Sequence, residues 1–148
     1  MTVVAAVDDS NRAATVLARA SALAADLGEP LHSLHVLQRT DLVDTLEKEV
    51  EGQAVTENRE VRRVGAEIIE RAAANAELEH DTAEIENVVR VGDPAEQITT
   101  YADSVDTRYI VVGGRRRSPT GKALFGSVTQ RVMLSSEVPV LNVPTSSQ

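Results

Sequence analysis

The sequence predicts an α/β fold in which a parallel sheet carries helices on both faces, built as one domain over residues 1–148. Two observations lead to this prediction. Short apolar runs rich in valine alternate along the chain with stretches that show helical periodicity. Strands that alternate with helices are joined by right-handed crossovers, so neighbouring strands run parallel and both faces are covered.

Five apolar runs have the length and composition of buried strands. They are Thr2 to Val7, Leu31 to Leu37, Thr82 to Val91, Tyr109 to Val112 and Pro139 to Val143. The fourth run stops at Gly113-Gly114, which we interpret as the end of the strand and the start of a loop. Ligands of parallel sheets sit beyond the carboxyl ends of strands, so Asp8 and Gly113 are expected to share one crevice if their strands are neighbours.

The first two helical patterns are long and amphipathic. One ends at Gly28 and Pro30, and its N-cap candidates are Asp8, Asp9, Ser10 and Asn11. The other runs from Val61 to near Asn75. Between them lies a polar segment, Gln38 to Asn58, with a weaker pattern that indicates a short helix around Leu42, Val43, Leu46 and Val50.

The last two helices carry stronger start signals. Asp93 is the expected N-cap of a helix that begins at Pro94, since Glu96 completes a capping box. Ser127 and Gln130 form a second such box at the start of the final helix.

Composition excludes several classes of function. A net charge of −8 argues against non-specific nucleic-acid binding, which requires a positive face. The absence of cysteine excludes disulfides and thiolate metal sites, and His32, His35 and His80 lack metal-ligand spacing, so no metal site is assigned. No apolar stretch has the length of a membrane span or a signal peptide, so we expect a cytoplasmic protein with no membrane partner.

The segment between the fourth strand and the last helix has the composition of a phosphate site. It contains Gly113-Gly114, then Gly126-Ser127, and between them the cations Arg115, Arg116, Arg117 and Lys122. Glycine lets the backbone approach a ligand, and the first amides and the dipole of a helix favour an anion. Taken singly, each glycine pair is equally explained as a turn or a helix start, with Ser127 capping the amide of Gln130.

Several segments together resemble the universal stress protein family over nearly the whole chain: VVAAVDDS, LHSLHVL, VRVGDPAEQI, IVVGG…FGSVTQRVM and VPVLNVP. The resemblance implies five parallel strands in the order 3-2-1-4-5, a Rossmann-like α/β fold of the adenine nucleotide alpha hydrolase type. It also implies a homodimer with a role in the stress response. The family includes ATP binders and members that do not bind ATP.

Nucleotide-binding members of the family carry the motif G-x-x-G-x9-G-[ST] after the fourth strand. Its first and last glycines fall on Gly113 and Gly126, and its hydroxyl residue on Ser127. The resemblance further implies that Asp8 bonds the adenine or ribose edge and that Val36 packs on adenine, although Asp8 is equally explained as a helix-capping acid. The expected nucleotide-binding set is Ala6, Val7, Asp8, Val36, Val112, Gly113, Gly114, Arg115, Arg116, Gly126, Ser127 and Val128.

One position departs from the motif, because Arg116 stands where the second glycine belongs. The arginine either fills the space of the phosphate chain and abolishes binding, or swings outward and adds a cation to the site. We favour the second reading, since a guanidinium suits bidentate phosphate contacts. The resemblance then implies ATP or a related adenine nucleotide as the cofactor, with or without a phosphate-bound magnesium ion.

No catalytic residue is assigned. The sequence lacks a G-x-S-x-G elbow and an H-E-x-x-H pair, and Ala123 follows Lys122 where a P-loop needs a hydroxyl. A regulatory binding module is therefore favoured over an ATPase, whose slow hydrolysis would depend on Asp8. The alternative is a chaperone-like interaction module without nucleotide, in which Arg116 blocks the phosphate site.

The last strand predicts a partner. In the implied strand order the run from Pro139 to Val143 lies at the sheet edge, and an exposed edge invites pairing with a second copy about a two-fold axis. The alternative is an edge protected by Pro139 and Pro144, which limit pairing.

Overall fold

The computed structural model describes residues 1–38, 59–76, 78, 84–114 and 126–144. The helix predicted around residues 42–50, together with His80, Arg115, Arg116, Arg117 and Lys122, lies outside the described residues. Within the described ranges, no helix is both long enough and apolar enough to span a bilayer.

The sheet has five parallel strands in the order β3-β2-β1-β4-β5, as the family resemblance predicted. The strands are β1 (Thr2–Ala6), β2 (Leu31–Leu37), β3 (Ile85–Val91), β4 (Thr107–Gly114) and β5 (Val140–Pro144). Strand β1 is central and pairs with both β2 and β4, so the order reverses there. Ligands of open α/β sheets bind at such a reversal, beyond the carboxyl ends of the strands.

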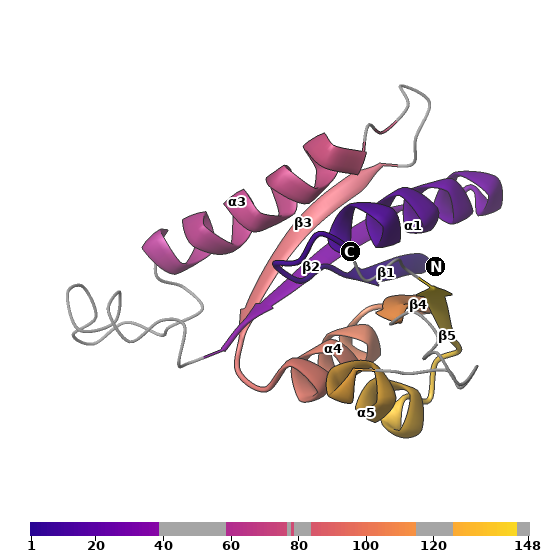
Figure 1. Cartoon of the computed structure of the whole chain (residues 1–148). Helices are drawn as coiled ribbons and strands as arrows, with labels where there is room; N and C mark the ends of the chain where they lie inside the picture. Colours follow the sequence, from indigo (N-terminus) through magenta and orange to yellow (C-terminus); the bar gives the residue numbers. More distant parts are fainter. Residues whose placement is uncertain (39–58, 77, 79–83, 115–125, 145–148) are drawn as a thin grey trace, which may run out of the picture.

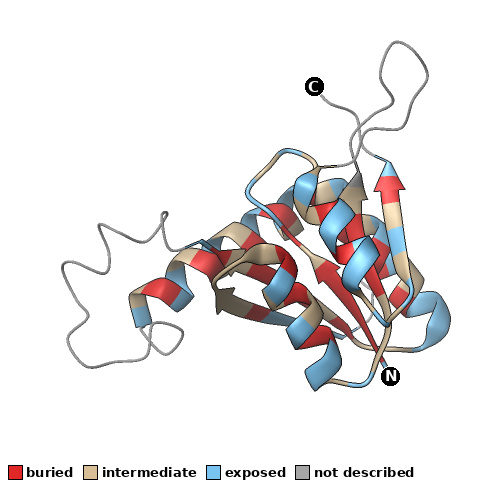
Figure 2. Ribbon diagram, turned by 90° about the horizontal axis from the view of Figure 1, so that it is seen from below, coloured by how far each residue is buried: buried red, intermediate tan, exposed pale blue. Residues whose placement is uncertain are grey.

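Two layers of helices enclose the sheet (Figure 1). Helices α1 (Ala13–Leu27) and α3 (Arg59–Ala76) lie over one face, and α4 (Pro94–Ser104) and α5 (Ser127–Ser135) lie over the other. The alternation of side chains along β1 divides the core between the two faces. Val3 and Ala5 pack beneath α1, whereas Val4 packs with Ile98 and Val132 on the side of α4 and α5. The buried residues consequently concentrate on the inner strands (Figure 2).

Two predicted strand ends are wrong. Strand β4 does not stop before the glycine pair, because Gly113 and Gly114 continue it and align with Val143 and Pro144 of β5. The β5 edge therefore supplies the backbone partners that hold both glycines extended. At the other side of the sheet, β3 begins at Ile85, three residues after the predicted start, and its register follows β2 throughout.

Helix ends test the cap predictions. Asp93 caps α4 as predicted, since its carboxylate accepts a hydrogen bond from the Glu96 amide at 3.0 Å. Gly28 ends α1 as predicted, in the left-handed conformation with φ of 67° that glycine adopts without strain. The predicted N-caps of α1 are wrong, because the cap position falls on Arg12. The Ser10 hydroxyl still accepts a hydrogen bond from the Arg12 amide at 3.2 Å.

The prediction that Ser127 caps α5 is also wrong. The cap position is Gly126, and no side chain bonds the helix start. The amide of Gln130 donates to the carbonyl of Gly126 at 3.0 Å, so Ser127 is the first residue of the helix. The Ser127 side chain therefore does not cap α5.

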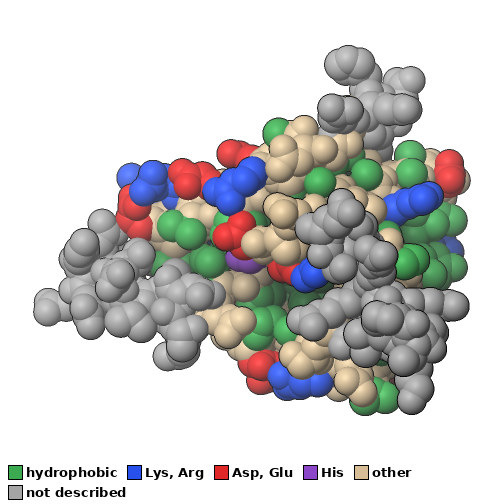
Figure 3. Space-filling model, viewed as in Figure 1, with side chains coloured by type: hydrophobic (Ala, Val, Ile, Leu, Met, Phe, Trp, Pro, Cys, Tyr) green, Lys and Arg blue, Asp and Glu red, His purple; other side chains and the backbone are tan. Residues whose placement is uncertain are grey.

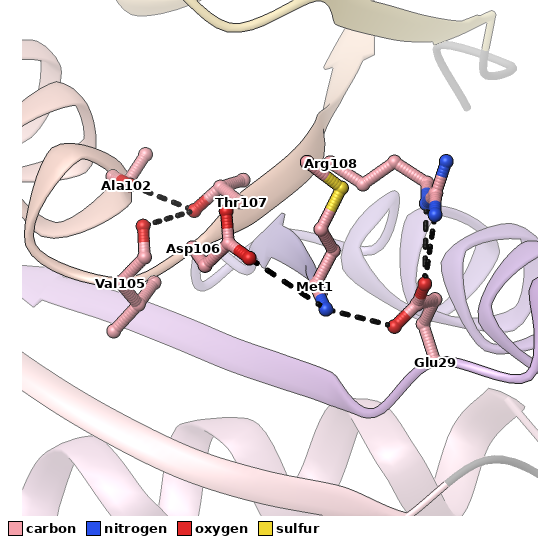
Figure 4. A network of polar contacts seen from close by, with 7 residues as sticks. All are labelled: Met1, Glu29, Ala102, Val105, Asp106, Thr107 and Arg108. Atoms are coloured by element: carbon pink, nitrogen blue, oxygen red, sulfur yellow. Dashed lines mark hydrogen bonds and ion pairs between the residues drawn. The ribbon is translucent and has the colours of Figure 1, made fainter.

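The amino ends of the strands carry a network of polar contacts (Figure 4). The Glu29 carboxylate accepts hydrogen bonds from Arg108 at 2.9 and 3.3 Å and contacts the Met1 amino group at 3.2 Å. The Asp106 carboxylate lies 3.9 Å from the same amino group. These contacts lower the pKa of Glu29, chiefly through the hydrogen bonds from Arg108.

Candidate functional site

Two hollows lie at the carboxyl ends of β1 and β4. The larger has a volume of about 540 Å³ and is lined by residues of β1, β2 and β4 and of helices from both layers. The smaller has a volume of about 200 Å³ and includes the amino end of α5. Five residues line both hollows, so the two form one continuous candidate site: Ala6, Asp8, Gly113, Val128 and Thr129.

The larger hollow has mainly apolar walls with a few polar groups. Val36, Val112 and Val128 line it from the side of α4 and α5, and Ile68 of α3 lines it from the other side. In Figure 3 hydrophobic side chains reach the surface between α3 and α4. Apolar walls with few convergent polar groups are typical of pockets for small organic ligands, including flat heterocycles.

His35 and Thr129 are the two buried polar residues that line the larger hollow. The His35 Nδ1 lies 2.6 Å from the carbonyl oxygen of Val7 and donates to it, which fixes the ring between β1 and β2. The sequence assigned His35 no metal and no binding role, and only its place at the carboxyl end of β2 could have indicated one.

The side chain of His32 in the same strand bonds other residues of the fold instead. Its Nδ1 lies 2.6 Å from the Tyr101 hydroxyl, and its Nε2 lies 3.2 Å from the Glu86 carboxylate. Burial is the main cause that raises the pKa of Tyr101. Among the described residues, no three histidine, aspartate or glutamate side chains gather closely enough to hold a metal ion.

The smaller hollow is built around the start of α5. Gly126 and Ser127 line it, and the first amides of a helix have no partner within the helix. Gly126 has φ of −64°, and a methyl group added there would meet no atom of a described residue within 4 Å. Ser127 is exposed, and its hydroxyl makes no hydrogen bond to any described residue. The described part of the fold therefore does not require glycine at 126, and the hollow that Gly126 and Ser127 line is a candidate place for a ligand.

At position 113, glycine is required by the packing of a helix on the strand. A Cβ atom at this position would lie 2.8 Å from Cγ2 of Val16, so α1 packs directly on the backbone of β4. The Gly113 carbonyl accepts a hydrogen bond from the Thr129 hydroxyl at 2.8 Å. Thr129 is buried and lines both hollows, so this bond fixes the first turn of α5 against the end of β4.

The loop after β1 contributes carboxylates to the site. The Ser10 hydroxyl donates to Asp8 at 2.5 Å, which holds this exposed carboxylate beside both hollows. Asp9 is turned toward α3, where Arg71 donates to it at 3.0 Å. Asp8 is therefore not the cap of α1, and its free oxygen is available to a bound molecule.

An ion pair joins the start of α4 to α5 beside the larger hollow. Arg131 of α5 donates to the Asp93 carboxylate at 2.9 Å, directly before Pro94, which lines that hollow. The hydrogen bond from Arg131 is the main cause that lowers the pKa of Asp93, and the Glu96 amide adds to it. Asp93 thus remains charged while it caps α4 and holds α5.

Most of the predicted nucleotide-binding residues come together at the two hollows. Those that line one or both are Ala6, Val7, Asp8, Val36, Val112, Gly113, Gly126, Ser127 and Val128. Gly114 pairs with Pro144 of β5, while Arg115 and Arg116 lie outside the described residues. Arg12 and Thr129 line the smaller hollow but were missed, although each stands within four residues of a predicted ligand.

Comparisons with known proteins identify the family of this chain. A model of the universal stress protein family matches residues 1–144. A universal stress protein of Mycolicibacterium smegmatis is 47% identical over 51 residues, which cover 34% of this chain and 39% of that protein. The chain thus matches about two fifths of the length of this curated relative.

Solved structures are similar over nearly the full length. A universal stress protein from Archaeoglobus fulgidus is 31% identical, with a TM-score of 0.61 and 96% and 97% of the two chains covered. A universal stress protein in complex with cAMP is 25% identical, with a TM-score of 0.66 and 99% and 98% covered. A universal stress protein from Archaeoglobus fulgidus in complex with dAMP is 26% identical, with a TM-score of 0.57 and 96% of each chain covered.

The family match spans nearly all residues, and the five-stranded order agrees with the fold that the resemblance implied. The chain therefore belongs to the universal stress protein family.

Proposed function

We propose that this chain is a regulatory module of the stress response that binds ATP or a related adenine nucleotide. The adenosine part would occupy the larger hollow and the phosphates the smaller one. The observation that carries this proposal is the junction of the two hollows, apolar on one side and built around a helix amino end on the other. One elongated ligand with a flat apolar end and an anionic end matches that arrangement.

Individual residues have distinct roles in the proposal. Val36 and Val128 would pack on adenine, and Asp8 would accept a hydrogen bond from the ribose or the base. Gly126 and Ser127 would hold phosphate oxygens through the backbone amides and the hydroxyl. Arg115 and Arg116 would add cations. A magnesium ion, if present, would be carried by the phosphates.

The relatives support this ligand class. Two of the similar solved structures are complexes with cAMP and with dAMP, both of which are adenine nucleotides. The proposed role requires binding and no catalytic residue, and its expected location is the cytoplasm.

Substitution of the residue that starts α5 tests the proposal. Gly126→Asp keeps a good helix cap but places a negative charge where a phosphate would bind. We expect ATP binding to weaken about tenfold or more, with the free energy of unfolding unchanged or raised. Isothermal titration calorimetry with ATP and with adenosine measures the first effect, and urea denaturation the second.

A matched control carries the same change of charge. Asn87→Asp alters an exposed residue of β3 that lines neither hollow, so ATP should bind as tightly as before. Failure of the unaltered protein to bind ATP at millimolar concentration would overturn the proposal. Gain of binding by Arg116→Gly alone would instead favour the interaction module in which Arg116 blocks the site.

We also propose that the chain forms a homodimer through β5. This strand is at the edge of the sheet, and Leu141 within it is 40% exposed. An unpaired edge with an exposed apolar side chain favours pairing with a second strand. Light scattering on the protein used for calorimetry should give twice the mass of one chain.

A further inference from the structure

We propose that Arg12 is a phosphate ligand of this protein and that it distinguishes phosphorylated adenine nucleotides from adenosine. This inference rests on the proposed nucleotide site and adds a cation that lies outside its glycine motif. The residue follows the carboxylates of the β1–α1 loop and occupies the cap position of α1.

The position of Arg12 is fixed by the backbone around it. Its amide donates to the Ser10 hydroxyl at 3.2 Å, and its carbonyl accepts from the Val16 amide at 3.2 Å. Its backbone angles, φ of −80° and ψ of −18°, are already helical. The guanidinium therefore extends from an ordered helix start, and the residue lines the smaller hollow opposite the start of α5.

Several arginines among the described residues hold carboxylates, but Arg12 does not. Arg71 donates to Asp9 at 3.0 Å, and Arg108 donates to Glu29 at 2.9 Å. Across the described residues, the Arg12 guanidinium makes neither a hydrogen bond nor an ion pair. It is also the single basic residue among the described ones that line the smaller hollow.

The electrostatics of this arrangement favour a bound anion. A cation at the amino end of a helix opposes the helix dipole, and the first turn of α1 contains no acidic residue. The amino end of α5 adds a second positive pole to the same hollow. The Asp8 carboxylate also lines the hollow and offsets part of this positive charge, but its hydrogen bond is to the Ser10 hydroxyl and no ion pair joins it to Arg12. A phosphate between the two helix ends would neutralise this excess, and the guanidinium fork fits two of its oxygens.

The proposal is tested with Arg12→Gln, which shortens the side chain little and removes its charge. We expect this variant to bind ATP and inorganic tripolyphosphate about tenfold or more weakly, while adenosine binds as before. Titration calorimetry measures all three ligands. Arg19→Gln is the matched control, because Arg19 is an exposed residue of the same helix that lines neither hollow and its loss changes the net charge equally.

The outcomes separate this inference from the proposed function. Equal ATP affinity in Arg12→Gln and the unaltered protein would overturn the role of Arg12 and leave nucleotide binding intact. Arg12-dependent binding of tripolyphosphate without any binding of ATP would support Arg12 and overturn the nucleotide proposal. No binding of either ligand by the unaltered protein would overturn both. Thermal unfolding without ligand confirms that both variants are folded.

Discussion

Polar side chains at the amino ends of the central strands bond one another, whereas some at the carboxyl ends bond no described residue. At the amino ends, the Glu29 carboxylate accepts a hydrogen bond from Arg108 and forms an ion pair with the Met1 amino group (Figure 4). At the carboxyl ends, Arg12 and Ser127 make no side-chain hydrogen bond to a described residue, and both line a hollow. Polar groups that the fold does not use are the ones available to a ligand. The comparison thus separates groups that stabilise the sheet from groups that the proposed site leaves open.

The largest expected effect comes from filling the close contact at the carboxyl end. Gly113→Ala would place a methyl group 2.8 Å from Cγ2 of Val16, a buried β-branched side chain with little freedom to turn. The free energy of unfolding should fall by about 1–3 kcal/mol, as for other overpacked cores. Urea denaturation measures the loss, and the double variant Gly113→Ala/Val16→Ala should lose less than the sum of its two single variants. An unchanged midpoint in Gly113→Ala would contradict the packing role of this glycine.

A smaller effect is expected where a buried polar bond joins α5 to β4. Thr129→Val keeps the shape of the side chain but removes the donor to the Gly113 carbonyl. The free energy of unfolding should fall by about 1 kcal/mol, and ATP should bind more weakly because the start of α5 loses its anchor. The control is Thr15→Val on the exposed face of α1, which should alter neither quantity. Loss of stability with full retention of ATP affinity would show that the bond serves the fold alone.

The smallest effect belongs to the amino-end network, which is close to solvent. Glu29→Gln removes a carboxylate whose pKa is lowered, first by the hydrogen bonds from Arg108 and then by the Met1 amino group. A lowered pKa stabilises the fold above the ordinary glutamate value of about 4.3, and this contribution is lost as the pH falls below it.

Melting temperatures recorded from pH 7 to pH 3 measure this contribution. Unaltered protein should melt slightly higher than Glu29→Gln at pH 7, and the difference should disappear near pH 3. Addition of salt should also reduce the difference, since exposed pairs are screened. Glu137→Gln, at an exposed position without an ion pair to the described residues, serves as the control. A difference that grows toward pH 3 would contradict the role assigned to the Glu29 carboxylate.

Most of the fold follows from local signals in the sequence. Apolar runs and helical spacing predicted all five strands, and Gly28 and Asp93 marked two helix ends because their backbone requirements are local. Which residue caps α1 or α5 was not predictable in the same way. The observed cap positions are Arg12 and Gly126, and neither is one of the polar residues that the cap pattern selects.

The candidate site was partly predictable for a similar reason. A spacing motif identified Gly113, Gly126 and Ser127, which lie close in sequence. Thr129 and His35 were missed because their roles depend on contacts across the sheet, with the carbonyls of Gly113 and Val7. Such contacts join residues 16 and 28 positions apart and leave no periodic signal.

The tight packing of Val16 on β4 also indicates which glycine should be used to recognise nucleotide binders among related sequences. Glycine at 113 is demanded by the scaffold itself, so evolution would retain it even in a descendant that had stopped binding any nucleotide. Glycine at 126 is under no such demand from the described residues, since a Cβ atom there would meet none of their atoms within 4 Å. A genome survey that scores binders by the first glycine would therefore count too many, and the glycine at the helix start is the informative marker.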